Sequence, residues 1–378
     1  MSKAKKLGFG LMRLPLTNPD DAGSVDIPRV CEMVDRFIAD GFTYFDTAFM
    51  YCNGKSEETA NKVLVSRYPR DKFTLATKLP TYLLHEPADC DKVFDIQRER
   101  TGVEFFDYYL LHDVNSKSLP AFEEYHCFDW IKEKKAQGLI KNIGFSFHDG
   151  PETLDRILTK YPFMEFVQLQ INYLDWESDT VQSRACYEVA RKHNKPIIIM
   201  EPVKGGALAN VPEMVETMFR HHDANRSTAS WALRFAAGLD GVMMVLSGMS
   251  NLEQLEDNMG FMADFVPLND DEVAMVHRAA DMINGTIAIA CTGCAYCVTD
   301  CLQNIAIPQY FSLYNAEKRE SIAKDWTTQE MYYDSLTQNF GKASDCIACG
   351  NCEQMCPQHL PIRTLLKDVA AQFEGVAD

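Results

Sequence analysis

The stretch FTYFDTA at residues 42–48 is a short, β-rich apolar run that ends in polar residues, and a helix-like segment follows it. The same pattern of strand and helix recurs along the chain. The other seven runs are LGFGLMRL (7–14), KFTLATKL (72–79), FDYYLLHD (106–113), IKNIGFSFH (140–148), FVQLQINY (166–173), PIIIMEPV (196–203) and VMMVLSGM (242–249). Runs that are nearly continuous in apolar residues are typical of parallel strands buried on both faces, and the segments between them carry helical periodicity.

Eight alternating strand–helix units predict an α/β fold, a (β/α)8 TIM barrel. A doubly wound open sheet is the alternative, but no strand is followed by the GxGxxG turn of a dinucleotide-binding sheet. The last barrel helix is expected at about 270–283, and the glycine of INGT (283–286) ends it. We therefore predict a barrel domain over 1–285 and a small, mainly α-helical domain over 286–378.

Two cysteine runs mark the second domain. CTGCAYCVTDC (291–301) and CIACGNCEQMC (346–356) share the spacing C-x2-C-x2-C-x3-C, and Pro357 follows the second run. This is the bacterial ferredoxin pattern. In a reducing cytosol, tight cysteine runs bind metal rather than form disulfides. Zinc is the alternative, but a four-cysteine zinc site normally uses two separated pairs. The spacing therefore predicts two 4Fe–4S clusters.

The cluster ligands follow from the same pattern. In two-cluster ferredoxins the fourth cysteine of each run ligates the other cluster. The predicted sets are Cys291, Cys294 and Cys297 with Cys356, and Cys346, Cys349 and Cys352 with Cys301. The alternative is that each run closes its own cluster. Leu302 replaces the proline after the first run, so Cys301 departs furthest from the pattern. A helix-like spacer at 302–345 completes a ferredoxin-like domain.

Composition limits the partners. The chain has 378 residues with a formal net charge of −17, and so acidic a chain repels the phosphate backbone of nucleic acids. No run approaches the roughly 20 apolar residues of a membrane helix, and the first residues lack the apolar core of a signal peptide. We expect a cytoplasmic protein whose partners include neither nucleic acid nor membrane.

Polar side chains end the predicted strands, and in a barrel these ends meet at the mouth where active sites form. Asp46, Lys78 and His112 stand at the ends of three successive strands, and Tyr51 follows Asp46 in the next loop. This set suits carbonyl reduction. A tyrosine can act as general acid or base, a nearby lysine is expected to lower its pKa, and an aspartate can pair with that lysine. An imidazole can orient the carbonyl oxygen.

The segments GFTYFDTAFMY, ATKL, YYLLH and IGFSFH resemble the aldo/keto reductase family over about residues 5–285. The resemblance implies a (β/α)8 barrel whose Asp–Tyr–Lys–His tetrad matches Asp46, Tyr51, Lys78 and His112 in order. It further implies an oxidoreductase that reduces a small carbonyl compound, or oxidises an alcohol, with NAD(P)(H). Some bacterial relatives carry a C-terminal module similar to CIACGNCEQMCPQHLPI.

The nicotinamide-binding positions match less well. Ser146 corresponds to a family serine that holds the nicotinamide amide, but Phe147 stands where its asparagine partner would be. The family glutamine on the sixth strand corresponds to Gln170, with Gln168 as second choice. Met200 replaces the aromatic residue that stacks on the nicotinamide.

The phosphate-binding positions differ too. The two basic residues that read the 2′-phosphate of NADP in the family fall on Gly248 and Gln254, upstream of Asn258. Their loss argues against a strong NADP preference. Glu201 and Lys204, on the loop after the seventh strand, are the remaining residues expected to contact cofactor or substrate.

Electron counting leaves three functions open. Hydride transfer moves two electrons together, whereas a 4Fe–4S cluster moves one, and a flavin normally mediates between them. No flavin fingerprint is present, although a barrel phosphate site leaves little trace in a sequence, so a flavin is not excluded. The chain is expected to be an aldo/keto reductase whose clusters are structural or carry electrons. The alternatives are a ferredoxin-linked reductase that draws electrons from a partner protein without nicotinamide, and a redox or iron sensor on a barrel scaffold. The intact tetrad argues against the sensor.

Overall fold

The computed structural model describes residues 5–178, 181–285, 288–319 and 327–375. Eight parallel strands form a closed barrel in the order of the sequence. They are β1 (Leu7–Gly10), β2 (Tyr44–Asp46), β3 (Thr74–Leu79), β4 (Phe106–Val114), β5 (Ile140–Phe147), β6 (Phe166–Gln170), β7 (Ile197–Met200) and β8 (Val242–Gly248). The predicted (β/α)8 barrel is confirmed, and the open sheet is excluded because β1 pairs with β8.

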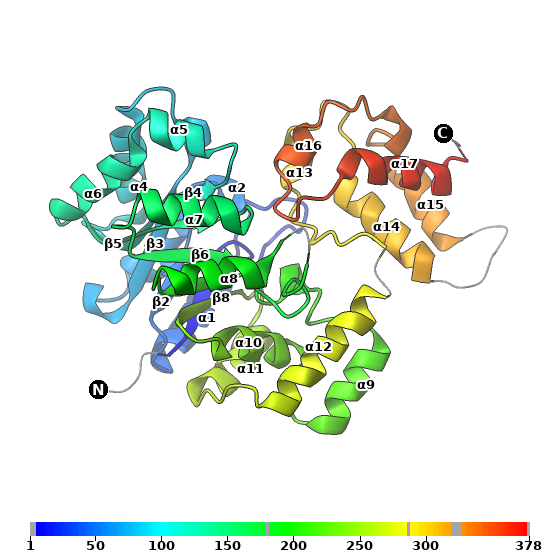
Figure 1. Ribbon diagram of the computed structural model, residues 1–378, viewed down its shortest axis with the longest axis horizontal. Coiled ribbons are helices and arrows are strands. Elements are labelled where there is room, and N and C mark those ends of the chain that lie inside the picture. Colours follow the sequence, from blue (N-terminus) through cyan, green and yellow to red (C-terminus); the bar gives the residue numbers. More distant parts are fainter. Residues whose placement is uncertain (1–4, 179–180, 286–287, 320–326, 376–378) are drawn as a thin grey trace.

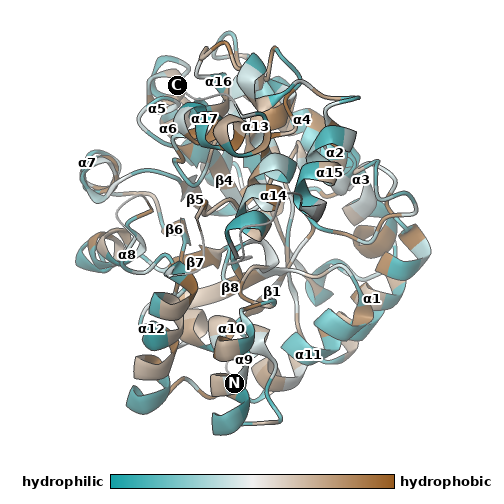
Figure 2. Cartoon of the chain, turned by 90° about the vertical axis from the view of Figure 1, so that its right-hand side faces the viewer, coloured by the Kyte–Doolittle hydropathy of each residue, from teal (hydrophilic) through white to brown (hydrophobic). Residues whose placement is uncertain are grey.

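Helices surround the barrel (Figure 1). The longer ones are α1 (Ile27–Ala39), α4 (Asp89–Thr101), α6 (Cys127–Ala136), α7 (Pro151–Lys160), α8 (Ser183–Lys192), α9 (Glu213–His222), α10 (Thr228–Gly238), α11 (Leu252–Ala263) and α12 (Asp270–Asn284). Shorter helices are α2 (Tyr51–Gly54), α3 (Ser56–Ala60) and α5 (Leu119–Glu124). In α1 the buried residues Val30, Met33, Val34 and Phe37 follow helical spacing and form one apolar face. Figure 2 shows both hydrophilic and hydrophobic residues along these outer helices, as expected for helices with one buried face.

The barrel interior is filled by side chains rather than open. Tyr44, Leu110, Phe166 and Ile198 form a cluster inside the strands. Gly144 on β5 makes room for this packing, because a Cβ at that position would lie 2.6 Å from the ring of Phe166. The lower barrel is therefore closed core, and chemistry is confined to the mouth.

The C-terminal helices form a second body beside the barrel, shown in orange and red in Figure 1. They are α13 (Tyr296–Thr299), α14 (Ile307–Arg319), α15 (Thr328–Leu336), α16 (Asn351–Gln354) and α17 (Ile362–Phe373). Their own core contains Tyr310, Phe311, Tyr333 and Leu366. The described part of the spacer between the cysteine runs is thus mainly helical, with an isolated bridge between Ile305 and Gly341. The predicted boundary at 285/286 stays a prediction, since residues 286–287 lie outside the described residues. Within the described residues, no helix is long and apolar enough to cross a membrane.

Candidate active site at the barrel mouth and cysteine-lined cavity

The structure brings the four predicted tetrad residues together. Asp46 ends β2, Tyr51 begins α2, Lys78 lies on β3 and His112 on β4. The Lys78 ammonium donates to Asp46 Oδ1 at 2.6 Å, to the carbonyl oxygen of Thr47 at 2.8 Å and to Tyr51 Oη at 3.3 Å. These bonds account for all three ammonium hydrogens. Tyr51 receives a hydrogen bond at its oxygen, so its own O–H is left to donate to a group in the mouth.

A tight loop holds Tyr51 in place. Cys52, Asn53 and Gly54 have φ values of 53°, 51° and 79°, so three successive residues adopt the left-handed conformation. Only Gly54 does so without steric cost. The thiol of Cys52, at 3.4 Å, and the hydroxyl of Ser56, at 2.9 Å, both donate to the carbonyl oxygen of Leu11. The loop is therefore anchored to the end of the first strand.

Burial governs the ionisation of Tyr51. Loss of solvent raises the pKa of Tyr51 well above its usual value, and the charges of Asp46 and Glu201 raise it further. The expected lowering of this pKa is wrong in its net direction, because desolvation of the phenolate by burial is the largest cause and raises the pKa. The phenol is therefore protonated at neutral pH and can serve as a proton donor.

His112 is held neutral beside it. Its ring lies edge-on to the Tyr51 ring, with 6.1 Å between the ring centroids. Burial lowers the pKa of His112 well below its usual value, and the nearby charges of Lys78 and His148 lower it further. A neutral imidazole carries one N–H and can donate it to a carbonyl oxygen.

A buried network behind β3 supports Lys78, and sequence reasoning missed it. Gln97 Nε2 donates to the carbonyl oxygen of Lys78 at 2.9 Å and to Glu57 Oε1 at 2.7 Å. Thr77 Oγ1 also donates to Glu57 Oε1 at 2.7 Å. Glu57, Thr77 and Gln97 are fully buried. No motif in the sequence marks them, since they come from α3, β3 and α4.

Two residues predicted to bind cofactor instead contact the second domain. Gln170 Nε2 donates to Asp175 Oδ2 and to Gln358 Oε1, at 3.1 Å each. Lys204 forms an ion pair with Asp175 and donates to Gln358 Oε1 at 2.9 Å. Gln358 follows the second cysteine run, so the helical domain reaches into the barrel mouth at β6 and β7.

The other predicted cofactor residues lie apart from this network. Ser146 Oγ on β5 accepts a hydrogen bond from the amide of Asp113 at 2.8 Å. Asn258 on α11 donates to Ser247 Oγ at 3.1 Å. Met200 Sδ on β7 accepts from Gln168 Nε2 at 3.5 Å.

Gly248, the remaining member, is exposed at the end of β8 and lies against the side chain of Arg13. Gln170 and Lys204 are bonded to Gln358 in this structure, so each would have to release Gln358 to contact a nicotinamide.

Several buried polar atoms at the mouth lack a partner. Among the described residues they include Asp46 Oδ2, His148 Nδ1, Gln168 Oε1, Gln170 Oε1 and Glu201 Oε2. Burial raises the pKa of Glu201, against the opposing charges of Arg13 and Lys204. Buried polar atoms in native proteins are normally hydrogen-bonded to protein, water or ligand. The mouth is therefore suited to a polar ligand.

The first cysteine run also lies at the mouth. Tyr296, between Cys294 and Cys297, places its hydroxyl 3.7 Å from Met12 Sδ. Burial raises the pKa of Tyr296 well above its usual value, and the neighbouring Tyr51 is the next cause. The sequence analysis missed Tyr296. It also missed Arg13, although Arg13 is the polar end of the first strand and the strand-end pattern could have found it.

The structure brings together the cysteines of the first predicted ligand set, and the full three-plus-one division stays a prediction. Cys291, Cys294, Cys297 and Cys356 line one cavity, together with Gln358. In the second group, burial raises the pKa of Cys352 to about 11, and the next causes include Cys346 and Cys301. No three His, Cys, Asp or Glu side chains among the described residues are grouped closely enough to hold a single metal ion. A cavity lined by four thiols fits a 4Fe–4S cluster.

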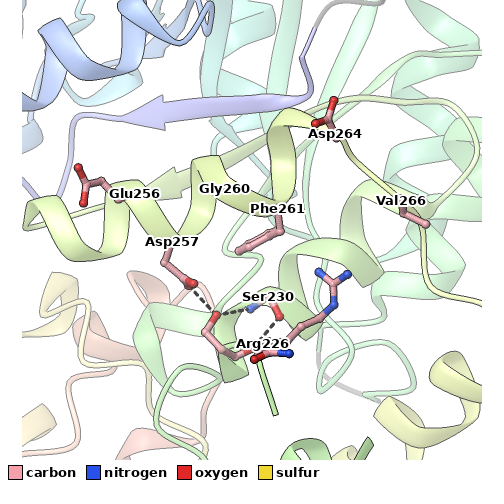
Figure 3. Close-up of a pocket in the computed structure, with 10 residues that line it drawn as sticks. Arg226, Ser230, Glu256, Asp257, Gly260, Phe261, Asp264 and Val266 are labelled. Atoms are coloured by element: carbon pink, nitrogen blue, oxygen red, sulfur yellow. Dashed lines mark hydrogen bonds between the residues drawn. The ribbon is translucent and has the colours of Figure 1, made fainter. Parts of the chain in front are cut away.

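A separate hollow of about 860 Å³ lies between α10 and α11 (Figure 3). Its walls include Arg226, Glu256 and Asp264, and Ser227 Oγ donates to Asp257 within it. Ser227 also caps α10 by accepting from the amide of Ser230. These contacts stabilise a helix start, and no predicted site residue lines this hollow.

The closed barrel holds Lys78, Asp46, Tyr51 and His112 at its mouth and is joined to a cysteine-rich helical domain. Sequence comparison gives the family. Residues 6–281 match the aldo/keto reductase family, and residues 290–361 match the 4Fe–4S dicluster domain. The chain therefore belongs to the aldo/keto reductase family and carries a C-terminal 4Fe–4S dicluster domain.

Individual relatives agree with this assignment. An uncharacterized oxidoreductase of Schizosaccharomyces pombe is 26% identical over 270 residues, covering 67% of this chain and 80% of the relative. An aldo-keto reductase from Bacillus halodurans in its holo form is 22% identical, with a TM-score of 0.59, over 72% of this chain and 91% of that one. An aldo-keto reductase from Klebsiella pneumoniae in complex with NADPH is 19% identical, with a TM-score of 0.57, over 72% and 90%. The two solved structures show the shared fold.

Proposed function

We propose that this oxidoreductase reduces a small carbonyl compound, or oxidises the corresponding alcohol, at the barrel mouth. The observation that carries the proposal is the hydrogen bond from Lys78 to Tyr51 Oη, which leaves the tyrosine proton pointing to the mouth. Reduction adds two electrons and two protons across the carbonyl bond. Tyr51 gives one proton to the oxygen, and the neutral His112 positions that oxygen.

The electrons have two candidate sources. NAD(P)H, when bound, supplies a hydride, and family membership supports this source. The second candidate is delivery of two single electrons, one after the other, through the clusters from a partner protein, with the proton on carbon taken from water. It is supported by the bonds from Gln170 and Lys204 to Gln358, which occupy two of the residues that a nicotinamide would need.

Tyr51→Phe tests the site. We expect turnover of a panel of small aldehydes and ketones to fall about 10²- to 10⁴-fold, the usual value of a general acid, with cluster content unchanged. Tyr44→Phe is the matched control, because Tyr44 is a buried barrel tyrosine whose hydroxyl has no partner and which lies outside the tetrad. Unchanged turnover in Tyr51→Phe would remove the proposed role of the tetrad.

The electron source is tested with the same panel under anaerobic conditions. The wild-type protein is assayed with NADH, with NADPH and with a chemically reduced viologen, which donates single electrons. Turnover with the viologen and none with either nicotinamide would support the cluster route. Rapid turnover with a nicotinamide after the clusters have been removed would eliminate that route.

A further inference from the structure

Gln358 stands where the two domains meet. It follows Cys356 and Pro357 and is 2% exposed. It lines the cavity formed by the four cysteines Cys291, Cys294, Cys297 and Cys356. It also lines a cleft on the barrel side that contains Lys204 and Asp175. One side chain therefore borders both the predicted cluster site and the barrel mouth.

The orientation of the Gln358 amide is fixed by its partners. Its Oε1 accepts from Lys204 Nζ at 2.9 Å and from Gln170 Nε2 at 3.1 Å. A flipped amide would place its NH₂ group against an ammonium and another NH₂ group, which have no lone pair to offer. The nitrogen of Gln358 therefore points away from both donors, and this buried Nε2 has no partner.

A buried amide N–H without an acceptor carries a free-energy penalty of about 1–3 kcal/mol. Such a group indicates an acceptor beyond the protein atoms. Gln358 also lines the cavity whose walls carry the thiols of Cys291, Cys294, Cys297 and Cys356. A 4Fe–4S cluster, when bound, supplies one-electron chemistry, and hydrogen bonds to its sulfur atoms tune its reduction potential.

We propose that Gln358 donates its N–H to sulfur of the cluster held by Cys291, Cys294, Cys297 and Cys356, and that Gln358 and Lys204 together raise the reduction potential of that cluster. The proposal rests on this ligand set, which is itself proposed. Reduction adds one negative charge to the cluster. An N–H donor and a nearby ammonium both stabilise that charge, so both favour the reduced form.

Lys204 is held close to the cysteine loop by the backbone. Lys204, Gly205 and Gly206 all have positive φ, at 46°, 64° and 102°. A Cβ on Gly205 would lie 2.6 Å from the carbonyl oxygen of Thr292, so this turn packs directly on the first cysteine run. Lys204 is 4% exposed, and water screens a buried charge only weakly.

The same contacts couple the predicted cluster site to the barrel mouth. Gln170 ends β6 and Lys204 follows β7, and both open onto the mouth that contains the tetrad. A ligand at the mouth that draws Lys204 or Gln170 away from Gln358 would lower the cluster potential. By linkage, the redox state of the cluster would change the affinity for that ligand by the same factor.

The experiment is an anaerobic redox titration of the full chain, followed by electron paramagnetic resonance. Gln358→Met removes the N–H donor at nearly constant volume, and Lys204→Met removes the charge. Gln168→Met is the matched control, because Gln168 is a buried glutamine on β6 that bonds to Met200 rather than to Gln358. We expect one of two midpoint potentials to fall in Gln358→Met and in Lys204→Met, and neither to move in Gln168→Met.

A second measurement covers variants that fold poorly. Hyperfine spectra of the reduced wild-type protein in H₂O and D₂O should contain a coupling from an exchangeable proton that Gln358→Met lacks. Unchanged potentials in both variants, or an unchanged proton coupling, would overturn the proposal. The ligand set is judged separately. Cys291→Ala and Cys356→Ala should remove the same one of the two cluster signals. Loss of different signals would refute the proposed ligand set. The results for Gln358→Met could still be interpreted in that case.

Discussion

Two buried lysine–aspartate pairs stand at the barrel mouth, and they are built differently. Lys78 and Asp46 come from adjacent strands of the barrel, and the third hydrogen bond of Lys78 goes to a tyrosine of the same domain. Lys204 and Asp175 come from the loops after β7 and β6, and Gln358 of the second domain completes their network. All four tetrad residues come from the barrel, whereas both domains supply the hydrogen-bond network of Lys204. If the clusters carry electrons, as the second candidate under the proposed function has it, the added domain acts on the side of the mouth that contains Lys204.

The largest expected effect concerns the cysteine ligands of the second domain. Cys356→Ala should remove one whole cluster, so that iron falls from about eight to about four atoms per chain. Cys291→Ala should lose the same cluster, and Cys301→Ala the other one. Iron and sulfide analysis with anaerobic spectra measures this. If Cys356→Ala instead matched Cys346→Ala, each run would close its own cluster and the first run would not depend on the second.

The two lysines give the next comparison. Lys78→Met leaves Asp46 buried without its counter-charge, and Lys204→Met does the same to Asp175. Breaking a buried pair in this way lowers the free energy of unfolding by about 3–5 kcal/mol. Urea unfolding should give losses of this order for both variants. Only Lys78→Met should leave both cluster potentials at their wild-type values, and a shift in that variant would mean that the two sides are not separate.

The sequence predicted that the four tetrad residues lie together, but it did not predict the network of Lys204, Asp175 and Gln358. The reason is physical. The tetrad residues stand on consecutive strand ends, and a closed barrel must bring consecutive strand ends together. Gln358 lies more than 150 residues from Gln170 and Lys204, and no periodicity links the three. The cysteine spacing predicts a cluster ligand at Cys356, but it contains no information on where the cysteine domain docks. Burial also reversed the expected pKa shift of Tyr51, and burial depends on contacts that no local pattern contains.

A glycine pair tests the docking of the second domain. Gly205→Ala places a methyl group against the carbonyl oxygen of Thr292 and also strains a positive φ. Gly206→Ala strains a positive φ but meets nothing within 4 Å. Backbone strain alone costs about 1–2 kcal/mol. The midpoint temperature of thermal unfolding should therefore be modestly lower in Gly206→Ala than in the wild type, and lower still in Gly205→Ala. Equal losses would indicate that the turn does not pack on the cysteine run.

The smallest expected effect is a pH dependence of the free energy of unfolding that comes from His112 of the tetrad. The pKa of His112 in the folded protein lies below its usual value of 6.5, because burial and the charge of Lys78 disfavour the imidazolium. The unfolded chain then binds a proton that the folded chain resists, so stability falls as the pH drops below 6.5. One such site contributes at most about 1.4 kcal/mol per pH unit. His112→Gln should flatten the fall in the free energy of unfolding between pH 6.5 and pH 5, measured by urea titration at each pH. Burial also lowers the pKa of His148. The contribution of His148 to the slope of the free energy of unfolding against pH should therefore remain in that variant. An identical slope in His112→Gln and the wild type would show that His112 does not titrate against the buried Lys78, and the tetrad would then be more open to solvent than its contacts indicate.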